Sequence, residues 1–576
     1  MTSQPSPVTL TPEQCLRLHR ALEREGRSYD PAERMLRLPF SSPGYHTTLK
    51  GGWVHPIRES FMYAVALLDA GGEPERTRAL HILDRLLPLQ DIDPASRTYG
   101  IWSWFMEEPL EKMAPPDWNW ADFCGAQLLE IALTHGPLLP PPFPERIRTA
   151  IRHAARSVER RDVTLSYTNI AIMGSFVTLA AAETYEVPDL HAYAMDRLRR
   201  FHTYSRNHGF SEYNSSTYTV IALDELGRLL RYARTPEARA LAGDLYRIAW
   251  EEIANHFHAP TRQWAGPQSR AYQTLLPSRV SGLLHRATAG RFPDADADPA
   301  IDEHRLPHTC PPDLEPYFFS LETPRTVRQT FLPGTDGLPD TIGTTYLAPA
   351  FALGSVNVGD LWNQRRALLA YWGTAEAPSS LHLRFLHDGY DFSAAHLFSA
   401  QRGGDVLAGI GFATDGGDTH IGLDMIQNAT IIASDLRLRF ELQGAAASKI
   451  PPAPKFLADS WTLKDQDFHL AVTVPHALWG ENKGHWEGGE EAGKAWLDVV
   501  LYTGATREFR LTELPSSALA VAIRCSNEPA ALPTPKTLIQ EGRLHLEWDG
   551  LGVTCAATPQ TQEGLRRSFS RFGQRT

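Results

Sequence analysis

The chain alternates two kinds of helical segment, and this alternation limits its possible folds more than any other feature. Residues 169–186 (NIAIMGSFVTLAAAETYE) are apolar on nearly every side, whereas residues 190–207 (LHAYAMDRLRRFHTYSRN) carry one strongly charged face. A helix that is apolar all round must be buried, while a one-sided helix can face water. The sequence therefore predicts two layers, with one helix of each pair inside and the other outside.

The pairing repeats along the first half of the chain. Predicted pairs are 120–135 with 143–158, 169–187 with 190–206, and 216–232 with 235–256, after earlier helices at 11–26, 57–71 and 76–88. The apolar members of these three pairs begin roughly 47–49 residues apart. Such a period is typical of helical hairpins in an array or a ring. Because the repeats have diverged in sequence, we favour a closed (α/α) toroid over an open solenoid.

After about residue 320 the pattern changes to short alternating runs separated by Gly, Asp and Pro. Examples are 325–332, 379–387, 419–426, 436–444 and 518–525. This is the strand-and-turn pattern of a large antiparallel sandwich. Helices followed by strands indicate segregated domains, and 576 residues exceed what one core holds. We therefore predict an α+β multidomain protein, with a catalytic (α/α) toroid over 1–320 and an antiparallel β-sandwich over 321–576.

Composition excludes several classes of function. The net charge of −11 argues against a nucleic-acid partner, since phosphate binding needs a basic surface. The five cysteines form no C-x-x-C pair, and we expect neither a metal nor a cofactor. The sequence contains no run of about 18 apolar residues, so we expect no membrane span. The N-terminus lacks the pattern of a signal peptide, so we expect a cytoplasmic protein. The sequence leaves the oligomeric state open.

Unusual polar and aromatic residues stand where successive inner helices begin. In a toroid these ends face a central cleft. The segments are Asp117–Trp120, Ser166–Asn169, Phe210–Tyr218 and, in the next equivalent place, Trp264–Tyr272. Four repeats would thus present Trp, Asn, Tyr and Arg at one level. For single residues a structural role stays open, because Asn119, Asn169 and Ser216 could cap helices and Trp118 and Trp120 could belong to the core.

Asn, Tyr and Arg together suit β-elimination of a uronic-acid saccharide. This reaction removes the C5 proton beside the sugar carboxylate, so an amide or guanidinium must bind that carboxylate and spread the developing charge. A base must take the proton, and tyrosine, with an ordinary pKa near 10, becomes a useful base beside a cation. A histidine is commonly added to such a set.

The order of Asn169, the segment HGFSEYNSSTY at 208–218 and SRAY at 269–272 resembles the toroidal polysaccharide lyases. These are the chondroitin AC, hyaluronate, xanthan and heparinase II/III-like alginate lyases. The resemblance implies an (α/α) toroid followed by an antiparallel β-sheet domain. It implies that Asn169 neutralises the uronate carboxylate, that Tyr218 is base and acid, and that Arg270 tunes Tyr218 or holds the sugar. His208 is the histidine nearest the family's catalytic His, and Glu212 stands close to that place.

Two alternatives remain. Many inverting glycoside hydrolases are also (α/α) toroids with an acid and a base carboxyl, so Glu212 could act with Asp117 or Asp122. Acidic residues are also common at helix starts for structural reasons. A non-catalytic carbohydrate-binding protein is the other alternative. The partner of Glu212 separates the lyase from the hydrolase. A second carboxylate across a water-sized gap would favour hydrolysis, whereas pairing with Arg270, together with a free Tyr218 near Asn169, would favour elimination.

Further candidates would bind the saccharide, which we expect as the partner. Aromatic faces stack on sugars, and arginine binds carboxylates bidentately. Arg365 and Arg366 lie in a strand-like stretch at 357–371, where neighbouring residues point to opposite faces, and one of them could reach substrate or form an interdomain salt bridge. The substrate-binding candidates are Trp53, His55, Trp118, Asn119, Trp120, Tyr213, Asn214, Trp264, Tyr272, Arg365 and Arg366.

Overall fold

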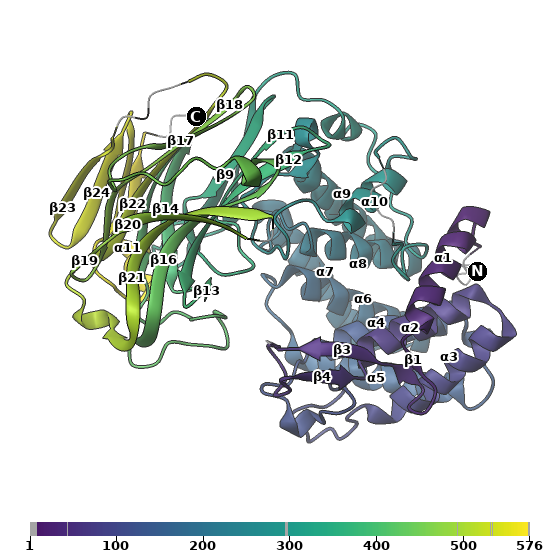
Figure 1. Cartoon of the computed structure of the whole chain (residues 1–576). Helices are drawn as coiled ribbons and strands as arrows, with labels where there is room; N and C mark the ends of the chain where they lie inside the picture. The colour runs from purple at the N-terminus through teal and green to yellow at the C-terminus, as the bar shows by residue number, and fades with distance from the viewer. Residues whose placement is uncertain are drawn as a thin grey trace. The chain divides into compact units, whose positions relative to one another are not determined.

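The computed structural model describes residues 9–42, 44–293, 298–491, 493–529, 532 and 534–573. Helices form the first half of the chain and antiparallel strands the second (Figure 1). The chain divides into two units that are interleaved in sequence. The first unit contains residues 1–207, 218–249 and 278–310, and the second contains residues 208–217, 250–277 and 311–576.

The predicted helices are present, with bounds that differ by at most three residues from the expected ones. They are α1 (Pro12–Gly26), α2 (Ile57–Ala70), α3 (Glu73–Leu86), α4 (Trp120–Thr134), α5 (Phe143–Arg161), α6 (Thr168–Tyr185), α7 (Pro188–His208), α8 (Tyr218–Tyr232) and α9 (Pro236–His256). A further helix, α10 (Ser278–Ala287), was not predicted. Short hairpins join β1 (Tyr29–Asp30) to β2 (Met35–Leu36), β3 (Leu38–Ser41) to β4 (Gly51–Val54) and β5 (Phe257–His258) to β6 (Gln263–Trp264).

Alternate helices of the first unit form a continuous inner row. α4 packs against both α2 and α6, and α6 packs in turn against α8. α6 is buried on every side from Thr168 to Ala182, as expected for a helix without a polar face. The paired helix α5 instead buries one stripe, including Ile147, Ile151 and Val158. The predicted alternation is confirmed, and the first unit is an (α/α) toroid of helical hairpins.

A buried group of charges joins the far ends of two inner helices to a later segment. Asp69, at the end of α2, accepts hydrogen bonds from His135 Nε2 (2.9 Å), His304 Nε2 (2.8 Å) and Arg305 Nη2 (2.7 Å). Arg305 also lies 3.2 Å from Glu130 of α4. The Asp69 and Arg305 side chains are 1% exposed. Because a buried charge must be paired, these contacts fix segment 304–305 against α2 and α4.

The second unit is built from antiparallel sheets. The nine-stranded sheet has the order β20 (His485–Glu491), β21 (Lys494–Arg510), β16 (Thr430–Gly444), β12 (Pro378–His387), β11 (Leu368–Gly373), β9 (Phe351–Val356), β8 (Thr341–Ala348), β7 (Arg325–Leu332), with β13 (Tyr390–Asp391) beside β12. The seven-stranded sheet has the order β10 (Val358–Asp360), β14 (Ala395–Arg402), β15 (Asp405–Phe412), β22 (Ser517–Ser526), β18 (Phe468–Trp479), β17 (Trp461–Asp465), with β19 (Asn482–Lys483) beside β18. A four-stranded sheet contains β23 (Lys536–Gln540), β24 (Arg543–Trp548), β25 (Leu551–Ala556) and β26 (Ser570–Phe572), and α11 spans Gln562–Ser568.

One apolar cluster lies between the two large sheets. It contains Leu383 and Phe440 of the nine-stranded sheet and Leu407 and Val472 of the seven-stranded sheet. Alternate residues of a strand point to opposite faces, so Arg384, next to Leu383, lies on the other face, where it binds Asp391. The predicted antiparallel β-sandwich is confirmed.

Two of the strand predictions were wrong. Residues 419–426 form turns, because local hydrogen bonds replace a ladder: the Thr419 hydroxyl donates to the Asp424 carboxylate, and the Asp424 amide donates to the His420 carbonyl (3.0 Å). The 357–371 stretch is not one strand, because a turn closed by the Arg365 amide and the Trp362 carbonyl (2.7 Å) separates β10 from β11.

Candidate functional site

The predicted site residues fall into two clusters, one in each unit. In the first unit they mark the starts of three inner helices: Asn119 precedes α4, Asn169 is the second residue of α6, and Tyr218 is the first residue of α8. α6 packs against both α4 and α8. Asn169 is 1% exposed and Tyr218 is half-buried. The fold thus places the Asn and Tyr of the proposed lyase set in the first turns of neighbouring helices.

The side chain of Asn119 does not cap its helix. Its Nδ2 donates to the Tyr167 hydroxyl (3.0 Å), and its Oδ1 accepts from Arg161 Nη1 (2.5 Å). These bonds tie the start of α4 to the residue that precedes α6 and to the end of α5. Asn169 is not the N-cap of α6 either, because Tyr167 occupies that position. Asn119 therefore occupies the N-cap position without a side-chain capping bond, and Asn169 lies within the first turn of α6.

The tryptophan candidates of the first unit differ in exposure. Trp120 stacks against Trp104 (centroids 5.2 Å apart) and lies under the guanidinium of Arg58 (5.3 Å), so its ring is buried. Trp118 is half-buried, and its indole donates to the Arg97 carbonyl (2.9 Å). Trp53, on β4, is 58% exposed. Among these candidates Trp53 and Trp118 have ring surface open for stacking on a sugar.

His55 and Asp117 have structural partners, and Asp122 is buried. His55 lies between two carboxylates, with Nδ1 bonded to Glu107 and Nε2 3.2 Å from Asp30. Asp117 accepts from the Trp104 indole (3.1 Å) and from the Asn119 amide (3.0 Å). Asp122 is buried in α4, and burial raises its pKa to about 7.

In the second unit, three separate segments singled out in the sequence come together. The Ser269 amide and hydroxyl both donate to the Tyr213 carbonyl (3.1 and 2.7 Å). The Ser215 hydroxyl donates to the Arg270 carbonyl (2.5 Å). Segment 268–271 is bonded in turn to 364–366, through a pair of backbone bonds between Gln268 and Arg366 (3.1 and 2.9 Å). The backbones of these segments therefore hold Glu212 and Arg270 in fixed positions.

Glu212 pairs with a cation. Its Oε1 lies 3.3 Å from Arg270 Nη1, and Arg270 Nε donates to Gln364 Oε1 (2.8 Å). The Arg270 guanidinium also lies over the Trp362 ring at 5.1 Å. A guanidinium held by a carboxylate, an amide and an aromatic face has little freedom to turn. Arg270 is therefore a partner of Glu212 in the structure.

Asn214 is buried and has a left-handed backbone with φ 45°. Its Nδ2 donates to the carbonyls of Ala265 (2.7 Å) and Pro267 (2.8 Å), and its Oδ1 accepts from the Trp264 indole. The Asn214 amide donates to the buried carboxyl of Glu252, whose pKa burial raises well above its ordinary value. Asn214 and Trp264 thus use their polar atoms within the protein.

The remaining candidates of the second unit lie in different surroundings. Tyr213 is buried and stacks on Phe331 (centroids 3.6 Å apart), and burial raises its pKa to about 12. Tyr272 is 58% exposed, and His208 is the half-buried last residue of α7.

The two adjacent arginines of the predicted strand lie in the turn before β11. Arg365 forms an ion pair with Asp360 (2.9 Å). The buried Arg366 donates from Nη1 to the Asn363 carbonyl (2.8 Å). Both cations therefore have partners inside the second unit.

Sequence reasoning missed several residues that position these side chains. Arg161 and Tyr167 hold Asn119, Gln364 holds Arg270, and Glu252 binds the Asn214 amide. Only Glu252 left a signal, as an acidic residue at a position of α9 that faces apolar neighbours. No group of three or more His, Cys, Asp or Glu side chains within the described ranges could hold a metal ion. No helix in the same ranges is long and apolar enough to span a membrane.

Comparisons with known proteins add the following similarities. Residues 39–289 match a family described as a domain of unknown function (DUF8769). No curated protein matches the chain. Among solved structures the chain is similar to the Streptomyces coelicolor A3 chondroitin AC lyase in complex with chondroitin sulphate, with 12% identity and a TM-score of 0.47 over 95% of this chain and 85% of that one. It is also similar to heparinase III, with 12% identity and a TM-score of 0.46 over 96% and 92% of the two chains.

Proposed function

We propose that the protein is a carbohydrate-active lyase that cleaves a uronate-containing oligo- or polysaccharide by β-elimination. In this reaction the Asn169 amide binds the uronate carboxylate and stabilises the charge that develops on it. Tyr218 takes the C5 proton and gives a proton to the leaving oxygen as the C4–O bond breaks, which leaves a C4=C5 double bond. The positions of Asn169 and Tyr218 in the first turns of two packed helices support this assignment.

The pairing of Glu212 with Arg270 favours elimination over hydrolysis. An inverting hydrolase needs two carboxyl groups on opposite sides of the sugar, far enough apart for a water molecule. Glu212 instead faces Arg270 at 3.3 Å, Asp117 is bonded to Trp104, and Asp122 is buried. Arg270, Glu212 and His208 are further candidates for catalytic residues. Their assignment rests only on their order in the sequence.

Two variants of α8 test the proposal. The protein is incubated with a panel of uronate glycans, and the ultraviolet band of the unsaturated sugar product is followed. Tyr218→Phe removes the proposed base, so we expect the rate to fall roughly 10²- to 10⁴-fold. Tyr232→Phe removes a buried hydroxyl at the other end of the same helix and serves as the control; it should keep most of the activity.

Three outcomes would contradict the proposal. The first is full activity of a folded Tyr218→Phe variant. The second is release of reducing ends without the unsaturated product, which would indicate hydrolysis. The third is no cleavage of any uronate glycan by the wild-type protein.

A further inference from the structure

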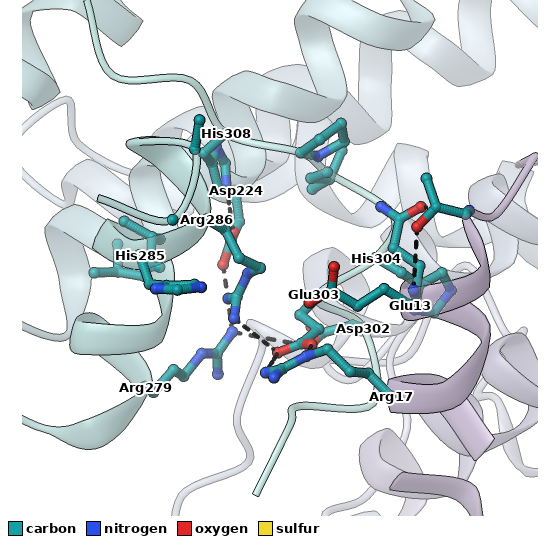
Figure 2. A pocket seen from close by; sticks show the side chains of 18 of the residues that line it. Glu13, Arg17, Asp224, Arg279, His285, Arg286, Asp302, Glu303, His304 and His308 are labelled. Carbon is teal, nitrogen blue, oxygen red and sulfur yellow. Dashed lines mark hydrogen bonds and ion pairs between the residues drawn. The ribbon is translucent and has the colours of Figure 1, made fainter. Parts of the chain in front are cut away.

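The first unit contains a cavity that the proposed reaction does not use. It has a volume of about 380 Å³ and is lined by residues of α1, α8, α10 and segment 302–308 (Figure 2). Small-molecule sites in proteins usually measure about 300 to 1,000 Å³. The cavity is therefore large enough for a small ligand.

The charges on its walls balance. Among the described residues four arginines and four carboxylates line the cavity: Arg17, Arg228, Arg279, Arg286, Glu13, Asp224, Asp302 and Glu303. Figure 2 shows several of them turned toward one another. Glu303 lies 2.5 Å from Arg17 and 3.0 Å from Arg286, and Asp224 lies 2.9 Å from His308 Nε2. A charged ligand would have to break such pairs, and a broken buried pair leaves an uncompensated charge.

A buried polar atom on the same walls lacks a hydrogen-bond partner within the described residues. His304 Nε2 donates to Asp69 (2.8 Å), which leaves Nδ1 as an acceptor, and this buried nitrogen has no partner within the described residues. His285 Nδ1 donates to the Phe292 carbonyl (2.7 Å), which makes its Nε2 an acceptor as well. Arg286 also lies on this wall, where its Nη1 is paired with Glu303 (3.0 Å). An unpaired buried atom such as His304 Nδ1 is rare and costly.

We propose that this cavity binds a small, uncharged, hydroxyl-rich ligand, the size of a mono- or disaccharide. A hydroxyl group both donates and accepts, so it can donate to His304 Nδ1 and His285 Nε2 and accept from a guanidinium of the wall such as Arg286. Val220, Leu283 and Leu306 add apolar wall that suits the C–H face of a sugar. The site is separate from the residues assigned to β-elimination, and the inference does not depend on that assignment.

Calorimetric titration of the full chain with glucose, galactose, mannose, xylose, maltose and cellobiose, and with glucuronate as the charged comparison, tests this site. We expect saturable 1:1 binding of at least one of the neutral sugars and a matching rise in the thermal unfolding temperature. His285→Phe and Arg286→Met should each weaken binding at least tenfold, because each removes a polar atom from the wall. Arg20→Met, an exposed position of α1 that does not line the cavity, is the matched control and should bind as the wild type does.

Binding is measured on variants that unfold cooperatively near the wild-type temperature, and two variants are used so that one failure to fold does not end the test. Three results would overturn the inference: no binding of any sugar, preferential binding of glucuronate, or equal affinity in both cavity variants and the control. Tyr218→Phe should keep the binding, which separates this outcome from a failure of the proposed lyase function.

Discussion

Arg228 of α8 is the cation of a buried group of carboxylates. It donates from Nε to Glu130 of α4 (3.0 Å) and from Nη1 to Glu225, one turn away on its own helix. All three side chains are at most 6% exposed. Burial raises the pKa of Glu225 to about 8, although the Arg228 charge acts in the opposite direction. At neutral pH Glu225 is therefore mostly protonated.

This protonation predicts a pH dependence of stability. Below a pH of about 4.5, its ordinary pKa, Glu225 is protonated in both the folded and the unfolded chain. Its contribution to the free energy of unfolding is therefore complete in that range. As the pH rises toward about 8 the unfolded chain releases the proton first, so the folded state loses stability. Glu225→Gln keeps the neutral form at every pH. We expect its free energy of unfolding, from urea titrations between about pH 5 and 8, to fall less than that of the wild type.

Glu130→Gln is the matched comparison, because it removes a buried carboxylate that is paired with both Arg228 and Arg305. Breaking a buried pair in this way costs about 3–5 kcal/mol, so this variant should be destabilised at every pH of the series. Parallel pH profiles for the wild type and Glu225→Gln would contradict the assignment of the proton to Glu225.

Among the structural elements, segment 264–271 and β9 lie unusually close together. A Cβ atom at Gly354 would come within 1.8 Å of the Gly266 carbonyl oxygen. Side chains never approach backbone so closely, so Gly354→Ala must push this segment away from the strand. Overpacking of this kind costs about 1–3 kcal/mol or more. We expect a lower unfolding temperature and, because Arg270 belongs to the same segment, a weaker hold on Glu212.

Gly504→Ala in β21 is the control for this prediction. The nearest atom to its new Cβ is the Tyr502 hydroxyl at 3.5 Å, an ordinary contact. Thermal unfolding by circular dichroism compares the two variants. Equal unfolding temperatures would mean that segment 264–271 is not packed on β9 in solution as it is in the structure.

The elements differ in how well the sequence predicted them. α6 was predictable because an apolar helix has a single place in a layered fold, and its bounds follow from its pattern. The 419–426 stretch was misread because its alternation is that of a strand, while the Thr419–Asp424 bond that makes it a turn is invisible to a pattern. For the candidate site the sequence predicted the order of the segments. It did not predict the Arg161–Asn119 bond, which depends on where α5 ends.

At the scale of the whole molecule, the two units alternate along the chain, so a single domain boundary does not separate them. The boundary predicted at 320 would assign segments 208–217 and 250–277 to the helical domain, but both belong to the second unit. Tyr213 stacks on Phe331 of β7 at 3.6 Å. Ala265 and Leu275 pack with Leu369 and its neighbours on the sheet. The second unit therefore includes parts of the chain that precede its sheets by more than a hundred residues.

Cutting the chain at 320 should therefore damage both products. A fragment of residues 1–320 keeps Tyr213 and Ala265 but lacks the sheet that covers them, and a fragment of residues 321–576 exposes Leu369. Exposed apolar surface of this extent promotes aggregation and binds hydrophobic dyes. We expect each fragment alone to be poorly soluble and to enhance the fluorescence of anilinonaphthalene sulfonate. Co-expression is the control, since it supplies the missing partners and should yield a soluble complex that unfolds cooperatively. If residues 1–320 alone gave a soluble, cooperatively unfolding protein without dye binding, the helical half would not need the sheet, and the interleaved division of the chain would be wrong.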